Sequence, residues 1–68
     1  MQVFVNSKQY LLPQSVTYLA DALTNFGITE PIGIAIAINN TVIPKTEWQQ
    51  YLLQADDKIM IIKATQGG

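Results

Sequence analysis

The chain has 68 residues and a formal net charge of −1, and it contains no His, Cys or Arg. It therefore lacks the imidazole that serves as a general base near neutral pH, the thiolate nucleophile, the soft metal ligands and the guanidinium that binds phosphate with two hydrogen bonds. A domain of this size also has little room for an enclosed pocket. We expect a protein that is not an enzyme, with no catalytic or metal-binding residues and no bound cofactor.

The charged side chains are scattered along the chain. The lysines are Lys8, Lys45, Lys58 and Lys63. They form no basic stripe, and affinity for phosphate backbones is largely electrostatic, so we expect no nucleic-acid partner. Among the carboxylates only Asp56 and Asp57 are adjacent. A hard-cation site needs more oxygen ligands at a loop spacing, and we interpret this pair as a solvated turn.

The sequence carries no sign of membrane insertion. No apolar run approaches the roughly 20 residues of a membrane-spanning helix, and the N-terminus does not have the pattern of a secretory signal. The absence of cysteine is compatible with a reducing compartment. We expect a cytoplasmic protein that does not bind membranes and is a monomer when free.

The first residues predict a β-hairpin. Strand-forming residues at Met1–Val5 and Gln9–Leu12 flank the turn-forming segment Asn6–Lys8. Pro13 then ends the pairing, because proline has no backbone N–H to donate.

A helix is predicted next. Ser15 is a suitable N-cap and Gly27 a suitable stop, and apolar residues recur at helical spacing between them, from Val16 to Phe26. We expect this helix to pack one apolar face on a sheet.

The C-terminal half predicts three strands. Ile32–Ile38 is the strongest strand signal, Asn39–Asn40 is a two-residue turn signal, and Thr41–Ile43 is a short returning strand. The last strand is Lys58–Lys63.

A short helical turn is predicted before the last strand. Thr46 can cap a turn over Glu47–Tyr51, which would place Trp48 and Leu52 on its inner side. We interpret Trp48 as a core anchor rather than a ligand contact.

Two of these strands are apolar on both faces. The isoleucines of Ile32–Ile38 share one face by the two-residue period, while Ala35 and Ala37 share the other with Gly33. In the last strand, Met60 and Ile62 point away from Ile59 and Ile61. We hypothesise that Ala35, Ala37, Met60 and Ile62 form a docking patch for partner proteins. The alternative is that loops of the same chain cover this face.

The chain ends in Gly67-Gly68 directly after a strand. Because glycine has no Cβ, this end can pass through a channel that is too narrow for side chains. A stalk of Thr65 to Gly68 reaches about 13 Å when extended, which is enough to enter the active site of a partner. The alternative is a frayed terminus with no function.

The predicted order is hairpin, helix, central strand, short strand, helical turn and final strand. We expect an α+β fold with a mixed sheet of four or five strands wrapped on one main helix. The final strand should lie centrally in the sheet, parallel to the first.

The chain resembles the ThiS family of sulfur carrier proteins from thiamine biosynthesis, which have the ubiquitin-like β-grasp fold. The matching segments are Val3–Asn6, Ala35–Asn39, Val42–Lys45, Glu47–Trp48, Asp57–Ile59 and Gly67–Gly68. The family often has Arg where Lys45 stands and Gly where Asn40 and Asp56 stand. Asn and Asp tolerate left-handed backbone angles, so we expect both turns to survive.

The resemblance implies a single β-grasp domain over residues 1–68, with 65–68 as a flexible tail. It implies that an E1-like, ThiF-like enzyme uses ATP to adenylate the Gly68 carboxylate, which a sulfur donor system converts to a thiocarboxylate. It further implies that thiazole synthase, a ThiG-like partner, then receives the sulfur. On this reading we expect Gly68 to be the modified residue and Thr65, Gln66 and Gly67 to enter the partners' active sites.

Three alternatives stay open. The chain could be the small, sulfur-carrying subunit of a molybdopterin synthase, which would form a stable complex with a larger subunit. It could be a ubiquitin-like modifier that is joined to lysines of other proteins. It could also be an interaction module whose tail is inert.

Overall fold

The computed structural model describes residues 1–28 and 32–63, so the expectations for Thr29–Pro31 and for residues 64–68 lie outside the described residues. The chain begins with the predicted hairpin, in which β1 (Gln2–Val5) pairs antiparallel with β2 (Lys8–Leu11). Asn6 and Ser7 link the strands with φ angles of 49° and 71°. Two successive positive φ angles match the right-handed twist of the flanking strands.

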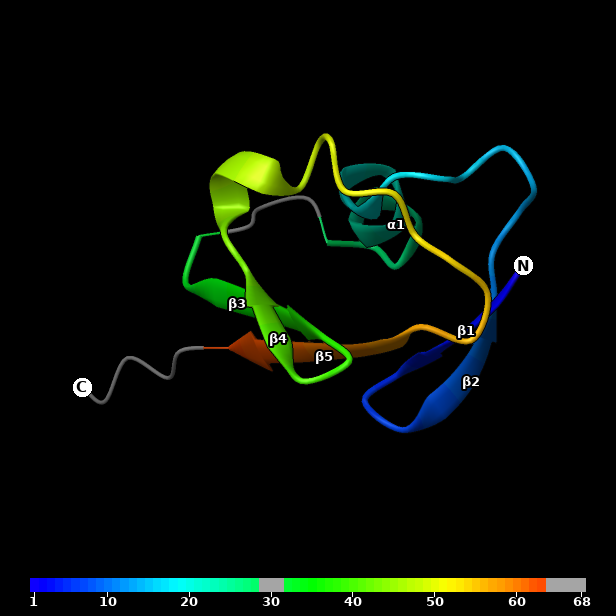
Figure 1. Cartoon of the computed structure of the whole chain (residues 1–68), viewed down its shortest axis with the longest axis horizontal. Helices are drawn as coiled ribbons and strands as arrows, with labels where there is room; N and C mark the ends of the chain where they lie inside the picture. The colour runs from blue at the N-terminus through cyan, green and yellow to red at the C-terminus, as the bar shows by residue number, and fades with distance from the viewer. Residues whose placement is uncertain (29–31, 64–68) are drawn as a thin grey trace.

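The sheet has five strands in the order β2-β1-β5-β3-β4. The last strand, β5 (Lys58–Lys63), lies between β1, to which it runs parallel, and β3 (Ile34–Ile38), to which it runs antiparallel. The short β4 (Thr41–Ile43) forms the edge beyond β3. The predicted central and parallel position of the final strand is therefore confirmed, and the architecture is the predicted α+β β-grasp (Figure 1).

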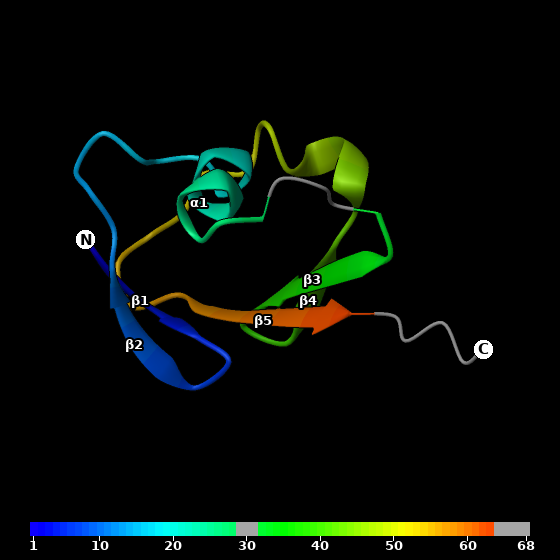
Figure 2. The ribbon, with the colours of Figure 1, turned by 180° about the vertical axis from the view of Figure 1, so that it is seen from behind.

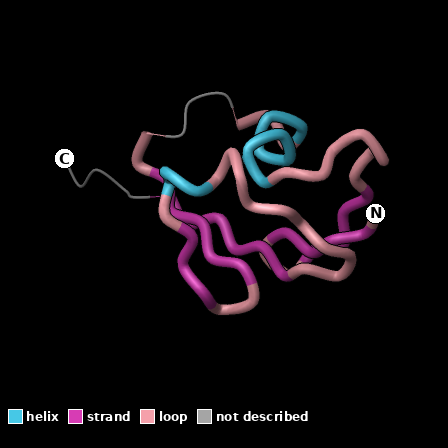
Figure 3. Tube along the Cα trace, turned by 45° about the horizontal axis from the view of Figure 1, so that its top comes forward, coloured by secondary structure: helices cyan, strands magenta, loops and turns pink. Residues whose placement is uncertain are grey.

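The helix and the long connection between β4 and β5 lie on the same side of the sheet (Figures 1 and 2). Viewed with the top brought forward, the strands gather on one side of the molecule and both helical segments on the other (Figure 3). The side that carries α1 (Leu19–Asn25) is called the inner face below, and the opposite side the outer face.

The helix is shorter at its start than the predicted Val16–Phe26. Its N-cap is Tyr18, without a side-chain cap, so the prediction that Ser15 caps the helix is wrong. The backbone N–H groups of Leu19 and Ala20 donate instead to the carbonyl oxygens of Tyr51 (2.9 Å) and Trp48 (3.0 Å). A neighbouring segment thus supplies the acceptors that a capping side chain would otherwise provide.

The same segment explains why the residues before the helix are extended. Tyr18 forms an antiparallel β-bridge with Leu52, and the Leu53 N–H donates to the Thr17 carbonyl oxygen at 2.8 Å. This pairing holds residues 17 and 18 in an extended conformation. The helix therefore begins only at Leu19.

The helix ends at Asn25 with Phe26 as its C-cap, and the predicted stop residue Gly27 follows with a φ angle of 90°. The Gly27 N–H donates to the Thr24 carbonyl (3.0 Å) and the Ile28 N–H to the Leu23 carbonyl (2.9 Å). These two bonds form a Schellman motif, in which glycine takes the left-handed conformation at least cost.

The core lies between the inner face and the helix. Its buried residues are Val3, Leu12, Leu19, Ala22, Leu23, Ile36, Ile38, Ile43, Trp48, Leu53 and Ile59. Trp48 is 5% exposed, and its indole Nε1–H donates to the Ile43 carbonyl oxygen at 2.8 Å. This geometry confirms Trp48 as a core anchor.

The segment around Trp48 differs from the predicted helical turn. The only helical residues found between β4 and β5 are a 3-10 turn, η1 (Lys45–Glu47), with Pro44 as N-cap, so Thr46 does not cap a turn over Glu47–Tyr51. Leu52 is 57% exposed and Leu53 is 4% exposed. The chain is extended here, so the two-residue period of a strand decides which leucine points inward.

Asp57 is not part of a solvated turn, contrary to the sequence interpretation. It is 8% exposed, its Oδ1 accepts a hydrogen bond from Asn39 Nδ2 (3.0 Å), and its Oδ2 accepts one from the Gln54 N–H (2.8 Å). Asn39 Oδ1 in turn accepts from the Lys58 N–H (3.1 Å). The carboxylate therefore ties the turn between β3 and β4 to the start of β5.

The turns at Asn40 and Asp56 survive without glycine, as predicted. Their φ angles are 70° and 69°, within the left-handed region that Asn and Asp tolerate better than other non-glycine residues.

Within the described part of the chain, no helix has the length and apolar character that crossing a membrane requires.

Candidate functional site

The four residues of the predicted docking patch come together on the outer face. In the antiparallel pairing of β3 with β5, Ala35 lies opposite Ile62 and Ala37 opposite Met60. Directly opposed residues project to the same face of a sheet. Met60 and Ile62 are 51% and 46% exposed, so these two cross-strand pairs form one apolar surface at the centre of the sheet.

Further apolar residues extend this surface across the sheet. Val42 of β4 lies opposite Ala37 and is 66% exposed, and Phe4 of β1 lies opposite Lys58. The sequence did not predict that Val42 and Phe4 lie on the outer face, because strands of three or four residues show too little alternation to assign a face. Their positions become clear only from the pairing register across the sheet.

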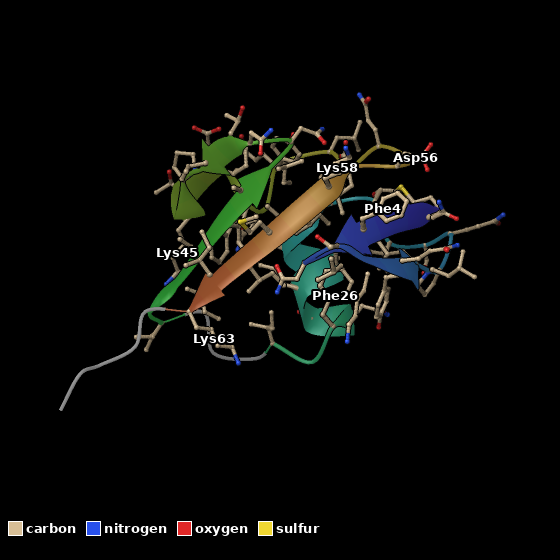
Figure 4. All side chains as sticks on the ribbon, turned by 90° about the horizontal axis from the view of Figure 1, so that it is seen from below. Phe4, Phe26, Lys45, Asp56, Lys58 and Lys63 are labelled. Atoms are coloured by element: carbon tan, nitrogen blue, oxygen red, sulfur yellow. The ribbon has the colours of Figure 1, made fainter. Side chains whose placement is uncertain are left out.

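One charged residue projects from the outer face of the described strands. Lys58 precedes Met60 by two residues and Ile62 by four, so the three side chains project from the same face of β5. The Lys58 side chain is exposed. Figure 4, which views the sheet from below, shows Phe4 and Lys58 near one end of β5 and Lys63 at the other end. Because Lys63 is the last residue of β5, the chain continues toward Gly68 from the end of the sheet opposite to Lys58.

The Asn6 side chain extends the pairing of β5. Its backbone N–H donates to the Ile59 carbonyl (2.9 Å), while its Oδ1 accepts from the Ile61 N–H (2.9 Å) and its Nδ2 donates to the Ile61 carbonyl (3.5 Å). The amide of this turn residue thus takes the place of a further backbone unit of β1. It holds β5 at Ile61, two residues beyond Ile59 and two residues before the strand ends at Lys63.

This contact leads to a prediction about the end of β5. Asn6→Gly keeps the left-handed backbone but removes the side chain, and we expect it to lower the free energy of unfolding by about 1 kcal/mol. Asn6→Ala also disfavours the φ angle of 49° and should lose about 1 kcal/mol more.

Amide hydrogen exchange measured by NMR checks this prediction. The Ile61 amide should exchange faster in both variants, while amides that donate within α1 should change only as global stability does. Unchanged protection of the Ile61 amide in Asn6→Gly would show that the Asn6 side chain does not hold the strand.

The remaining predicted site residues, Thr65, Gln66, Gly67 and Gly68, lie outside the described residues. Within residues 1–28 and 32–63, no group of three or more acidic, His or Cys residues is placed to hold a metal ion. What the described residues provide is an apolar outer face and a central strand that runs toward the Gly-Gly end.

A mixed five-stranded sheet wrapped on one helix, with a parallel pair formed by the first and last strands, defines a ubiquitin-like β-grasp protein. The chain belongs to the ThiS family, whose model matches residues 2–68.

Two known proteins are similar to it. Sulfur carrier protein ThiS of Escherichia coli (strain K12) is 30% identical over 70 residues, which cover all of both chains. The crystal structure of a thiamine biosynthesis protein (ThiS) from Geobacter metallireducens superimposes with a TM-score of 0.85 over all of both chains, at 14% identity. This structure shows that the fold is shared.

Proposed function

We propose that this protein is a sulfur carrier of thiamine biosynthesis, which holds the sulfur as a thiocarboxylate on Gly68. The observation that carries the proposal is the family match, because it extends from residue 2 to residue 68 and so includes Gly67 and Gly68. The name of the Escherichia coli relative, sulfur carrier protein ThiS, supports the same function.

The proposed chemistry begins with activation of an unreactive group. A carboxylate is a poor electrophile, because neither of its oxygens is a good leaving group. On an E1-like adenylating enzyme, a carboxylate oxygen of Gly68 attacks the α-phosphorus of ATP. A new phosphorus–oxygen bond forms, the bond to the β-phosphate oxygen breaks, and pyrophosphate leaves with the electron pair.

The second step exchanges oxygen for sulfur. A sulfur donor system supplies a nucleophile at the oxidation level of sulfide, which attacks the acyl carbon, and AMP leaves with the electrons of the carbon–oxygen bond. No net oxidation or reduction occurs. The thiocarboxylate is then a tethered nucleophile that delivers sulfur to thiazole synthase, and the catalytic groups of every step belong to the partners.

The residues before Gly68 have a steric role in this proposal. Thr65, Gln66 and Gly67 form the stalk that carries Gly68 into each partner, and Gly67 keeps the narrowest part of the stalk free of a side chain. The stalk follows β5, which pairs with β3 up to Lys63 and with β1 at Lys58 and Ile59.

The docking patch completes the proposal. Ala35, Met60 and Ile62 are exposed on the outer face of β3 and β5, and the buried Ala37 lies opposite Met60. The adenylating enzyme docks on this surface first and thiazole synthase docks on it afterwards. Since the two partners use the same small surface, their binding is mutually exclusive, and each complex must dissociate for the carrier to proceed.

Intact-mass analysis tests the function. The protein is incubated with ATP, a cognate adenylating enzyme and a sulfide source, beside a variant that lacks Gly68. We expect a gain of about 16 Da, the difference between sulfur and oxygen, for the intact chain alone. No gain with an enzyme that charges its own established carrier would contradict the proposal.

The intact protein and the variant that lacks Gly68 also distinguish the alternative functions. A stable complex between the charged protein and a larger synthase subunit would indicate a molybdopterin-synthase type of carrier. Covalent conjugates to lysines of other proteins in a cell extract would indicate a ubiquitin-like modifier. If removal of Gly68 changes none of these results, the chain is an interaction module.

A further inference from the structure

The outer face carries a sulfur-containing side chain that is open to solvent. The chain contains two methionines and no cysteine. Met60 of β5 is 51% exposed. Met1, in contrast, is partly buried against the core, and its amino group donates to the Leu12 carbonyl oxygen at 2.9 Å. Of the two thioethers in this chain, the one of Met60 is therefore the more accessible to a small molecule in solution.

The surroundings of Met60 leave its side chain accessible. Its cross-strand partner on the outer face is Ala37, which is small and 9% exposed, so the longer Met60 side chain projects beyond it. Both residues line a hollow of about 330 Å³, which is larger than a molecule of hydrogen peroxide requires. The hollow opens on the same face as the docking patch, to which Met60 itself belongs.

Oxidation of a thioether by a hydroperoxide is a two-electron step. A lone pair of the sulfur attacks one peroxide oxygen, so that a sulfur–oxygen bond forms and the oxygen–oxygen bond breaks. The leaving oxygen takes the bonding electron pair and the proton of the transferred hydroxyl group, which gives water when the oxidant is hydrogen peroxide. The sulfur loses two electrons, the peroxide gains two, and the product is methionine sulfoxide, whose oxygen is strongly polar.

From this placement, and on the basis of the proposed function, we propose that Met60 is a modification site, and that its oxidation by a hydroperoxide slows the charging of Gly68. A partner that docks on the patch removes water from the Met60 side chain. A sulfoxide oxygen that is buried against an apolar surface loses the hydrogen bonds that it makes with water. The oxidised carrier therefore binds its partners more weakly.

The direction of this effect suits a carrier of sulfur. A thiocarboxylate on Gly68 is an anionic sulfur nucleophile, and a hydroperoxide oxidises such a group readily. A carrier that is charged slowly while hydroperoxide is present exposes less of its sulfur to oxidation. The modification is also reversible, because methionine sulfoxide reductases return the sulfoxide to the thioether. Charging then resumes.

Peptide mass mapping after treatment with limiting hydrogen peroxide tests the site. We expect Met60 to be oxidised at least about three times faster than Met1, because it is the more accessible of the two. Mapping is required because an added oxygen and the exchange of oxygen for sulfur each raise the intact mass by about 16 Da. Oxidation of Met1 ahead of Met60 would overturn the assignment of the site.

Pyrophosphate release by the adenylating enzyme, measured as the carrier concentration is varied, tests the effect on charging. Carrier oxidised at Met60 is expected to have a KM about tenfold higher, with kcat within about twofold, because the added oxygen acts in binding and not at Gly68. Methionine sulfoxide reductases for both epimers, with a thiol as reductant, should restore the KM of the untreated protein. An unchanged KM in carrier fully oxidised at Met60 would overturn the proposal.

Met60→Leu and Met60→Gln distinguish oxidation of Met60 from other effects of peroxide. Each variant is compared with its own untreated form, whatever its activity before treatment. Neither has a thioether at position 60, so peroxide should leave the KM of both unchanged although Met1 is still oxidised. Met60→Gln places a polar amide on the docking patch and should have a raised KM without treatment. If peroxide raises the KM of Met60→Leu as much as that of the wild type, the effect does not come from Met60 and the proposal fails.

The thermal midpoint shows whether oxidation acts through folding. Met60 is not part of the buried core, so its oxidation should shift the midpoint little. Unfolding that accounts for the lost charging would contradict the proposal. Failure of the proposed function gives a different result, because the untreated wild-type protein is then not charged by an enzyme that charges its own established carrier.

Discussion

Replacement of Ile62 by aspartate is expected to lower kcat/KM for thiocarboxylate formation by about a hundredfold or more. Ile62 is 46% exposed and lies opposite Ala35 in the docking patch. In the docked complex, a carboxylate at this position would be removed from water against an apolar surface, with a penalty of about 3 kcal/mol or more. The readout is the initial rate of pyrophosphate release at low carrier concentration.

A matched variant separates the docking patch from a general effect of charge. Leu11→Asp introduces the same group on an apolar residue that is 73% exposed, but on β2, two strands away from β5. We expect its kcat/KM to stay within about threefold of the wild type. Ile62→Thr keeps a β-branched side chain suited to a strand, and its effect should fall between the two.

The outcome that would contradict this prediction is equally specific. If Ile62→Asp retains its thermal midpoint and is charged at the wild-type rate, the apolar surface on β3 and β5 does not contact the adenylating enzyme. Gly68 could still carry sulfur in that case, and docking would have to use another face.

Trp48→Ala is expected to lower the free energy of unfolding by about 3 to 5 kcal/mol, a large fraction of the total. Trp48 is 5% exposed and its Nε1–H donates to the carbonyl oxygen of the buried strand residue Ile43 at 2.8 Å. Truncation of a buried aromatic side chain costs about 3 to 5 kcal/mol, whereas a domain of this length has roughly 3 to 10 kcal/mol of stability in total. Circular dichroism and urea denaturation measure the loss.

Trp48→Phe distinguishes the two contributions of the indole. Phenylalanine keeps much of the buried area but cannot donate to the Ile43 carbonyl oxygen, so we expect a loss of about 1 to 3 kcal/mol and a folded protein. A Trp48→Ala variant as stable as Trp48→Phe would show that the hydrogen bond contributes more to stability than the packing of the ring does.

The sequence was sufficient to assign the faces of β3 and β5 because their patterns are local, although β3 begins at Ile34 rather than at the predicted Ile32, after Gly33 with a φ angle of 75°. Ile32–Ile38 alternates large and small apolar residues, and this alternation assigns Ala35 and Ala37 to the outer face without knowledge of the pairing. The alternation in Lys58–Lys63 does the same for Met60 and Ile62. The structure confirms both assignments by placing the four residues in two cross-strand pairs.

The helix start was predicted wrongly because it depends on tertiary contacts. Ser15 precedes a helical pattern and has the right chemistry for a cap, yet the acceptors for the first N–H groups of α1 are carbonyls of Trp48 and Tyr51. No local pattern around Ser15 indicates that a segment more than 30 residues later in the chain will occupy this place.

Asp57 was misinterpreted for a similar reason. Two adjacent carboxylates suggest a solvated turn, and one of them, Asp56, is exposed. The Asp57 carboxylate is buried because it accepts hydrogen bonds from Asn39, which lies 18 residues away, and from the Gln54 backbone. Such a pairing follows from the fold and cannot be inferred from the residues beside Asp57. The roles assigned to residues 65–68 and to the docking patch stay predictions.

The position of β5 has a mechanical consequence. A pull applied at Lys63 along the strand loads the hydrogen bonds to β1 and to β3 together, in shear, because β5 is bonded to both neighbours. A terminal strand at the edge of a sheet, pulled across its direction, would instead lose its bonds one after another. β5 can therefore bear tension applied at Lys63 while the rest of the fold stays intact.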